Sequence, residues 1–196
     1  MKKDSIPANE SGKKVDLVEE VEAGSTEEAT KIYNQARNRL LHPLYWKSIT
    51  GAVAAEFTPD TKDLSAGDYI QVDIPAPGLA AGDGHDWVQV ESIEEGCNPA
   101  AEESIAFTVE VCANPEHPEK GVAHFFAKGA TSTFIITRNK NIVKASYHGR
   151  NEKPNLENAG LADKIRNAVV GIGAMAGVSE LQWKAFLKGL LSASDK

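Results

Sequence analysis

Six side chains of this sequence could supply acid–base and anion-binding chemistry. They are His85, Asp86, His124, His148, Arg150 and Glu152. A histidine beside a carboxylate can serve as a general base with an orienting partner, and an arginine can clamp an anion. If the segments 121–127 and 142–148 share one sheet, these groups converge at a strand end. This interpretation predicts a hydrolase or an isomerase.

The same residues also have a structural interpretation. His124 alternates with Val122 and Phe126, which indicates a histidine at the edge of the core, bonded to a backbone carbonyl. Arg150 and Glu152 would then pair with helix ends. Because no nucleophile or metal-ligand spacing accompanies the six residues, the structural interpretation is the one that we favour.

The loop from Pro75 to His85 is a second candidate site, because it is long for a connection between two strands. Loops of this length inside compact domains often carry function. The residues that we assign to a ligand or a partner are Pro77, Gly78, Gly82, Asp83, Gly84 and Trp87. The loop has no Lys or Arg and leads into a strand, which argues against a phosphate cradle. The alternative is a flexible surface excursion.

No pattern of metal ligands stands out in the sequence. The histidines are scattered without a helical i, i+4 pair, and there is no CxxC element. We therefore expect no metal and no cofactor. Cys97 and Cys112 are expected to be reduced, partly buried thiols.

The elements that must position these groups follow from a period of two in the apolar residues. Ile70, Val72 and Ile74 alternate with polar neighbours, and the run from Ile105 to Val111 repeats the pattern. Such alternation is typical of an antiparallel sheet with one face on a core and one face in water. It predicts strands near 51–58, 68–74, 86–94, 104–112, 121–127, 132–138 and 142–148.

One part of this region resembles small SH3-like barrels. The resemblance is carried by Gly67-Asp68-Tyr69-Ile70, a Gly-rich loop and Trp87-Val88-Gln89-Val90. It implies a curled, barrel-like arrangement in place of a flat sheet.

Helices are predicted before and after the strands along the chain. Ser25 with Glu28 forms a capping box that starts a helix, and Pro43 ends it near His42. Near the C-terminus, two apolar stripes separated by Gly177 predict a helical hairpin. The fold class is therefore α+β: a curled antiparallel sheet or small SH3-like barrel, packed by an N-terminal helix and a C-terminal helical hairpin.

The first 24 residues are polar and rich in charge. Such a segment buries too little surface to offset its ordering entropy, so residues 1–24 are expected to form a mobile polar tail. The alternative is that Val15 to Val21 adds a short strand to the sheet. Residues 25–196 are expected to form a single domain.

The chain has 196 residues and a net charge of -7, which repels phosphate backbones and anionic lipid. The segment Ala176-Gly177-Val178-Ser179 resembles the turn of DNA-binding helix-turn-helix units, but the following helix offers only Lys184 and Lys188 as cations. We expect a cytoplasmic protein that contacts neither nucleic acid nor membrane, because no long apolar segment is present.

The function predicted first is therefore a non-catalytic binding or assembly module, with a protein partner or a second copy of the chain. The absence of a catalytic pattern, the Pro/Gly loop and a sheet with edges favour this prediction. The alternatives are the hydrolase or isomerase above and, after it, helix-turn-helix DNA binding.

Overall fold

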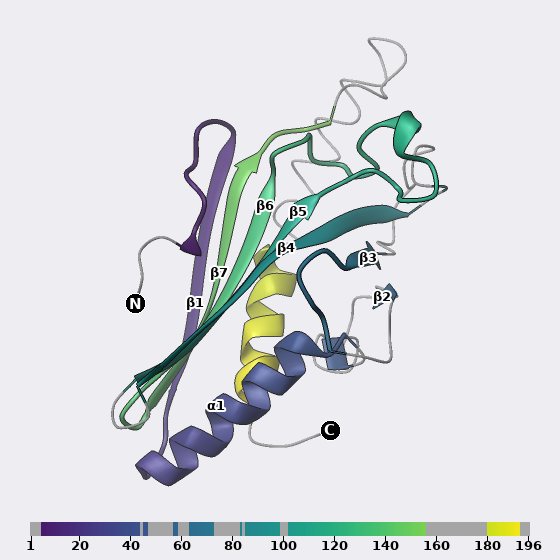
Figure 1. Ribbon diagram of the computed structural model, residues 1–196. Helices are drawn as coiled ribbons and strands as arrows, with labels where there is room; N and C mark the ends of the chain where they lie inside the picture. Colours follow the sequence, from purple (N-terminus) through teal and green to yellow (C-terminus); the bar gives the residue numbers. More distant parts are fainter. Residues whose placement is uncertain are drawn as a thin grey trace.

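A computed structural model describes most of the sheet and parts of the helical layer. The described residues are 5–43, 45–46, 57–58, 63–72, 83, 85–98, 102–155 and 180–192. Within them, seven strands form one antiparallel sheet in the order β1-β7-β6-β5-β4-β3-β2 (Figure 1). The strands are β1 (Lys13–Glu22), β2 (Phe57–Thr58), β3 (Tyr69–Val72), β4 (Asp86–Asn98), β5 (Glu102–Val111), β6 (Thr131–Asn139) and β7 (Ile142–Glu152).

The inner face of the sheet carries the apolar residues of each alternating strand. Directly opposite residues such as Phe107 and Phe134, or Ile105 and Ile136, put their side chains on the same face, and all four are buried. The helical layer covers this face (Figure 1). The apolar inner side of the predicted alternation is therefore found in β5, β6 and β7, whereas the outer side of β5 and β6 is buried at residues such as Thr108 and Thr133 and does not lie wholly in water.

Helix α1 (Thr26–Leu41) begins at the predicted cap. The Ser25 hydroxyl accepts a hydrogen bond from the Glu28 amide at 3.2 Å, and the Glu28 carboxylate accepts one from the Gly24 amide at 2.8 Å. The first bond satisfies an unpaired amide of the first helical turn, and the second binds the amide of the residue before the cap, one position earlier than in a capping box. The helix ends as predicted, because His42 is already extended before Pro43.

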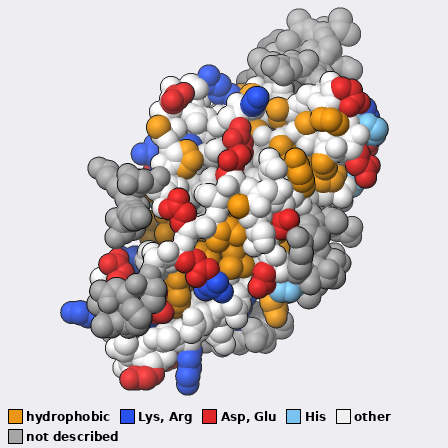
Figure 2. Space-filling view, in the orientation of Figure 1, with side chains coloured by type: hydrophobic (Ala, Val, Ile, Leu, Met, Phe, Trp, Pro, Cys, Tyr) orange, Lys and Arg blue, Asp and Glu red, His pale blue; other side chains and the backbone are white. Residues whose placement is uncertain are grey.

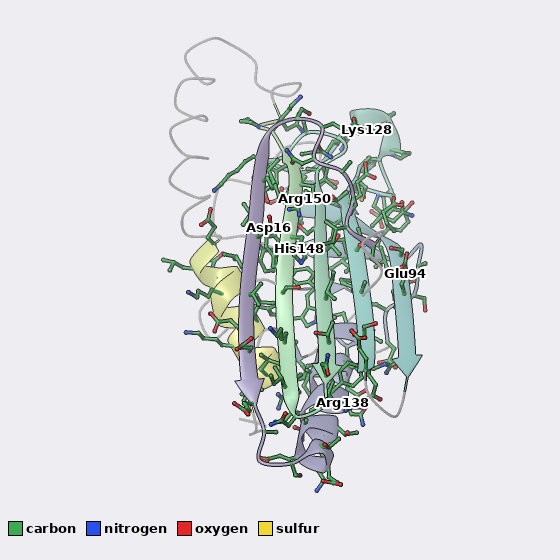
Figure 3. All side chains as sticks on the ribbon, turned by 90° about the vertical axis from the view of Figure 1, so that its left-hand side faces the viewer. Asp16, Glu94, Lys128, Arg138, His148 and Arg150 are labelled. Carbon is green, nitrogen blue, oxygen red and sulfur yellow. The ribbon has the colours of Figure 1, made fainter. Side chains whose placement is uncertain are left out.

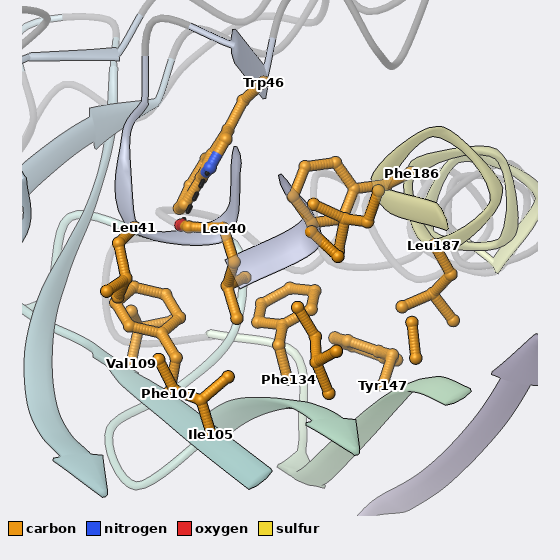
Figure 4. Packing of buried hydrophobic residues seen from close by; sticks show 14 of the residues in the cluster. Leu40, Leu41, Trp46, Ile105, Phe107, Val109, Phe134, Tyr147, Phe186 and Leu187 are labelled. Carbon is orange, nitrogen blue, oxygen red and sulfur yellow. Dashed lines mark hydrogen bonds between the residues drawn. The ribbon is translucent and has the colours of Figure 1, made fainter. Parts of the chain in front are cut away.

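A C-terminal helix over residues 180–191 packs on the inner face beside α1. Phe186, Leu187 and Leu190 are fully buried against the sheet. Figure 4 shows Phe186 and Leu187 over Phe134 and Tyr147 in the core. The predicted apolar stripe of this helix is confirmed. The first helix of the predicted hairpin, and the turn at residues 176–179, lie outside the described residues.

The α+β class with an antiparallel sheet is confirmed, whereas the SH3-like barrel is not. Strands β3 and β4 pair as the resemblance requires, with Tyr69 opposite Gln89, but they belong to a seven-stranded sheet. Among the described residues, no pairing joins β1 to β2. The first strand predicted, 51–58, is described only at its last two residues, as β2.

Two predictions about individual segments are wrong. Residues 13–22 are not part of a mobile tail but form β1, the alternative considered, because Val15, Leu17 and Val21 contribute to the core. Residues 121–127 form an irregular connection with isolated bridges in place of a strand. His124, Phe125 and Phe126 stack on one another, whereas a strand would turn successive rings to opposite faces.

Candidate functional site

A cluster of charged and polar side chains joins β1 to β7 on the outer face of the sheet (Figure 3). The Asp16 carboxylate lies 2.6 Å from His148 Nδ1 and 2.7 Å from Arg150 Nη2, both measured to Oδ1. Lys14 Nζ lies 3.3 Å from the second oxygen of Asp16. Three cationic or hydrogen-donating groups therefore converge on one carboxylate.

The register of the two strands explains this convergence. Asp16 stands directly opposite His148, and Arg150 follows His148 by two residues on the same face of β7. The guanidinium of Arg150 is buried and also donates to the Val15 and Gly149 carbonyls, at 3.0 and 2.8 Å. Arg150 therefore bridges side chain and backbone across the strand pair.

The ionisation of Asp16 is favoured by these partners. Partial burial opposes the charged form, but hydrogen bonds from His148, Arg150 and Lys14 outweigh it and lower the pKa of Asp16 to about 2. The carboxylate is therefore charged at any physiological pH. Its charge adds to the backbone pairing that joins β1 to β7.

Ser146 extends this cluster to a Ser–His–Asp arrangement. Its Oγ lies 3.0 Å from His148 Nε2, and 3.4 Å from the Ile135 carbonyl oxygen. With Nδ1 of His148 donating to Asp16, Nε2 is free to accept the serine proton, which is the geometry of an activated nucleophile. However, β7 pairs with β1 on one side and β6 on the other, so its amides are used in the sheet and do not form an oxyanion hole.

The N-terminal strap, residues 5–12, crosses the outer face before it enters β1 (Figure 3). Asn151 holds it: Oδ1 accepts from the Glu10 and Ser11 amides at 2.8 and 3.2 Å, and Nδ2 donates to the Ala8 carbonyl at 3.2 Å. At its other end, the Ser5 hydroxyl donates to Glu94 on β4 at 2.7 Å. The strap is thus fastened to two strands of the sheet.

Outer-face residues in the middle of the sheet are buried although the helices lie on the opposite face. Thr133 is fully buried and its hydroxyl lies 3.0 Å from that of Thr108, while the buried Thr131 hydroxyl has no hydrogen-bond partner. The strap is held at Asn151 on β7 and at Glu94 on β4, and it crosses the outer face between these strands, where β6 and β5 lie (Figure 3). We therefore assign it as the cover of these threonines.

The edge strand β1 has an uneven distribution of charge. Lys13 and Lys14 stand at its start, whereas Glu19, Glu20 and Glu22 stand near its end. Val18, between them, is 56% exposed. Figure 2 shows acidic and basic side chains interspersed over the face that it displays, with no broad patch of one sign.

The structure does not bring the six predicted catalytic residues together. His148 and Arg150 share Asp16 on the outer face. Glu152 lies on the inner face, where its Oε1 accepts from the Tyr147 hydroxyl at 3.1 Å. A bulge in β7 causes this difference. Lys13 opposes Glu152 and Val15 opposes Gly149, so β7 has one residue more than β1 in this interval. The extra residue moves the Glu152 side chain from the outer to the inner face.

The inner position changes the chemistry of Glu152. Burial raises the pKa of its carboxyl above the ordinary value, although the Tyr147 hydroxyl favours the charged form. Burial also raises the pKa of Tyr147, whose ring stacks on Trp183 at 5.0 Å. The hydrogen bond lies within β7, and the stacked rings of Tyr147 and Trp183 join this strand to the C-terminal helix.

His124 and Asp86 lie in a third place, around the connection between β5 and β6. Burial lowers the pKa of His124 to about 3, so the ring is neutral, and its Nδ1 accepts from the Phe126 amide. Asp86 Oδ1 accepts from the Phe125 amide at 3.0 Å. The predicted carbonyl partner of His124 is therefore replaced by an amide donor. His85, just before β4, has a buried Nδ1 without a hydrogen-bond partner.

The predicted ligand loop is described only in part. Asp83 accepts from Asn114 Nδ2 at 3.3 Å and pairs with Lys120 Nζ at 3.2 Å. Trp87 belongs to β4, and its indole nitrogen is buried without a partner. Pro77, Gly78, Gly82 and Gly84 lie outside the described residues.

Two site residues were not anticipated from the sequence, namely Asp16 and Ser146. A signal existed for Ser146, which precedes His148 by two residues in an alternating segment. Asp16 had none, since it is 132 residues from its histidine. Cys112 is free and half-buried, and burial raises the pKa of its thiol to about 12.

Over the described residues, no cluster of three or more His, Cys, Asp or Glu side chains is arranged to hold a metal ion. The described helices include none with the length and apolar character needed to cross a membrane.

Comparison with known proteins gives likeness at the level of the fold. No family model matches the chain, and no curated protein matches it. The crystal structure of hypothetical protein jhp0584 from Helicobacter pylori is 14% identical, with a TM-score of 0.50, over 93% of this chain and 88% of that chain. Protein Ms6760 from Mycobacterium smegmatis is 16% identical, with a TM-score of 0.41, over 89% and 90% of the two chains. The first likeness shows a shared fold and no function.

Proposed function

We propose that this chain is a non-catalytic protein-binding or assembly module, and that its contact surface is the outward edge of β1. The observation that carries the proposal is the position of this strand. It has ten residues, ends the sheet, and pairs with β7 alone among the described strands. An edge strand of this length presents backbone groups to which another strand can add.

The edge is held in place before any partner arrives. Asp16 ties the strand to His148 and Arg150 on the outer face. On the inner face, Lys13 pairs with Glu180, and Lys184 lies 3.8 Å from Glu19. A strand fixed from both sides loses less conformational entropy on association, which favours binding.

The test is a glutamate placed on this edge. Val18→Glu is expected to weaken association by about tenfold, because a charged side chain is a device by which natural edge strands avoid pairing, and because position 18 is flanked by the acidic residues Asp16 and Glu20. The full chain is used as bait, and the affinity for each recovered protein, or for itself, is measured by titration. Tyr69→Glu is the matched control, since Tyr69 is a 39% exposed side chain on β3. Equal affinities for both variants and the parent chain would refute the proposal.

A second candidate function is ester hydrolysis, which the distances of the Ser146–His148–Asp16 cluster favour. In it, Ser146 Oγ attacks an acyl carbonyl and His148 Nε2 takes its proton and passes it to the leaving alkoxide. Water then hydrolyses the acyl-enzyme. Labelling by a fluorophosphonate probe, lost in Ser146→Ala and kept in Ser132→Ala, would support it. A chain that takes up no probe leaves only the binding module.

A further inference from the structure

We infer that the partner which fits the β1 edge is a second copy of this chain, added antiparallel to form a continuous sheet across a two-fold axis. This inference rests on the proposed function and names its partner. Its basis is the charge sequence of β1: two lysines lie at the start of the strand and three glutamates near its end, while Asp16, before the centre, is bound by His148 and Arg150 of β7. Antiparallel pairing of such a strand with itself brings unlike ends together.

The pleat restricts the registers that this pairing can adopt. Directly opposite residues of neighbouring antiparallel strands point to the same face, so an even-numbered residue of β1 must oppose an even-numbered residue of the second copy. Asp16, Val18 and Glu20 oppose His148, Ser146 and Lys144 of β7, which places the even positions on the outer face. Lys14 is on that face too, since it pairs with Asp16.

Two registers near the centre of the strand satisfy this rule, and both bring Lys14 near Glu20 of the second copy. With Leu17 opposite itself, Lys14 opposes Glu20 of the second copy, and the two-fold axis repeats this pair. With Val18 opposite itself, Lys14 opposes Glu22 and lies diagonal to Glu20. The second register sets Asp16 against Glu20, and like charges directly opposite are unfavourable. We therefore assign the register centred on Leu17.

Within the described part of the chain, the N-terminal strap does not cover the outward edge of β1. The N-terminal strap reaches β1 from the side of β7 and β4, where Asn151 and Glu94 hold it, and so it leaves the outward edge uncovered. Lys14 and Glu20 remain 57% and 58% exposed in their present ion pairs with Asp16 and Lys144. Exposed pairs of this kind exchange partners at little cost.

The test is a charge reversal with rescue, followed by sedimentation or light scattering of the full chain over a range of concentrations. The parent chain is expected to dimerise, Lys14→Glu to raise the dimer Kd by about tenfold, and Lys14→Glu with Glu20→Lys to restore it. High salt weakens the parent dimer. Lys120→Glu is the control, because Lys120 has a comparable exposed ion pair with Asp83. Circular dichroism checks that each variant is folded.

A monomer at all concentrations, or a dimer that Lys14→Glu leaves unchanged, would overturn the inference. Failure of the proposed function can be distinguished from failure of this inference. If the chain is monomeric but Val18→Glu abolishes capture of a different protein, the edge binds a partner and the second copy is not that partner. If Val18→Glu, which sets a carboxylate opposite Asp16 in the assigned register, changes nothing, both are wrong.

Discussion

At the scale of single residues, the Asp16 carboxylate is the centre of the polar cluster on the outer face of the sheet, between β1 and β7. Asp16 receives hydrogen bonds from His148 and Arg150, and Lys14 stands beside its second oxygen. His148 and Arg150 belong to β7, so the contact links the first of the described strands to the last. Asp16 is 40% exposed at its side chain, and its contribution to stability is therefore that of a partly screened ion pair.

The contribution of Asp16 depends on pH. Because its folded pKa is lowered to about 2 and the unfolded value is about 3.9, the stabilisation is complete above about pH 4 and is lost as pH falls toward 2. Asp16→Asn is expected to cost about 1 kcal/mol at pH 7, discounted for screening, and almost nothing near pH 2. Urea unfolding at both pH values measures this. Asp83→Asn, on an exposed ion pair of the loop, is the control, and a pH-independent loss would contradict the assignment.

At the scale of elements, the bulge in β7 decides which side chains can work together. Asn151 has a φ of 57°, in the left-handed region, and the strand gains one residue against β1 there. As a result, Glu152 contacts Tyr147 on the inner face. The side chain of Asn151 points to the outer face, where it binds the N-terminal strap. One irregular residue, Asn151, thus separates the Asp16 cluster on the outer face from the Glu152–Tyr147 contact on the inner face. It also binds the N-terminal strap.

Removing the side chain of Asn151 should release the strap and leave the strand intact. Asn151→Gly keeps the left-handed backbone, and it deletes the groups that bind Ala8, Glu10 and Ser11. Amide exchange at Glu10 and Ser11 is expected to accelerate at least about tenfold, since their acceptor is lost.

Lys140→Gly is the control for this exchange experiment. Lys140 has a φ of 53° in the turn between β6 and β7, so glycine fits there also, without touching the strap. Amide exchange at Glu10 and Ser11 in Lys140→Gly should equal that of the parent chain. Unchanged exchange in Asn151→Gly would show that other contacts hold the strap.

At the scale of the whole molecule, stability comes from the helical layer on the inner face of the sheet. Aromatic rings connect the layers, with Phe186 at 5.6 Å from Trp46 and 5.5 Å from Phe134. Figure 4 shows the same cluster continuing to Leu40 and Leu41 of α1. The terminal segments of the chain therefore share one core with the middle strands.

Two leucines of the C-terminal helix give a direct measure of this packing. Leu187 is fully buried and Leu181 is 71% exposed. Leu187→Ala is expected to lower the free energy of unfolding by about 3 kcal/mol, through lost burial and a residual cavity, whereas Leu181→Ala should change it by less than about 0.5 kcal/mol. Chemical denaturation of both variants tests this, and similar losses would mean that the helix does not pack as described.

Much of the fold could be predicted from the sequence, and much less of the candidate site. Strands β5, β6 and β7 follow from alternating residues such as Ile105 and Phe107, and α1 follows from its cap at Ser25 and its stop before Pro43. The prediction for 121–127 was wrong, because three successive aromatic rings mimic a strand without alternating across a sheet. His148 and Arg150 were singled out, but their partner Asp16 was placed in a tail.

The sequence by itself determined where the chain can be strand or helix, because hydrogen-bonding caps and apolar periods act over a few neighbouring residues. Only the tertiary structure decided which strands are neighbours, and so which side chains meet. Asp16 contacts His148 because β1 lies beside β7 in one register, and Glu152 leaves them because one extra residue turns its side chain to the other face. Both outcomes depend on pairing between distant segments, which no local pattern encodes.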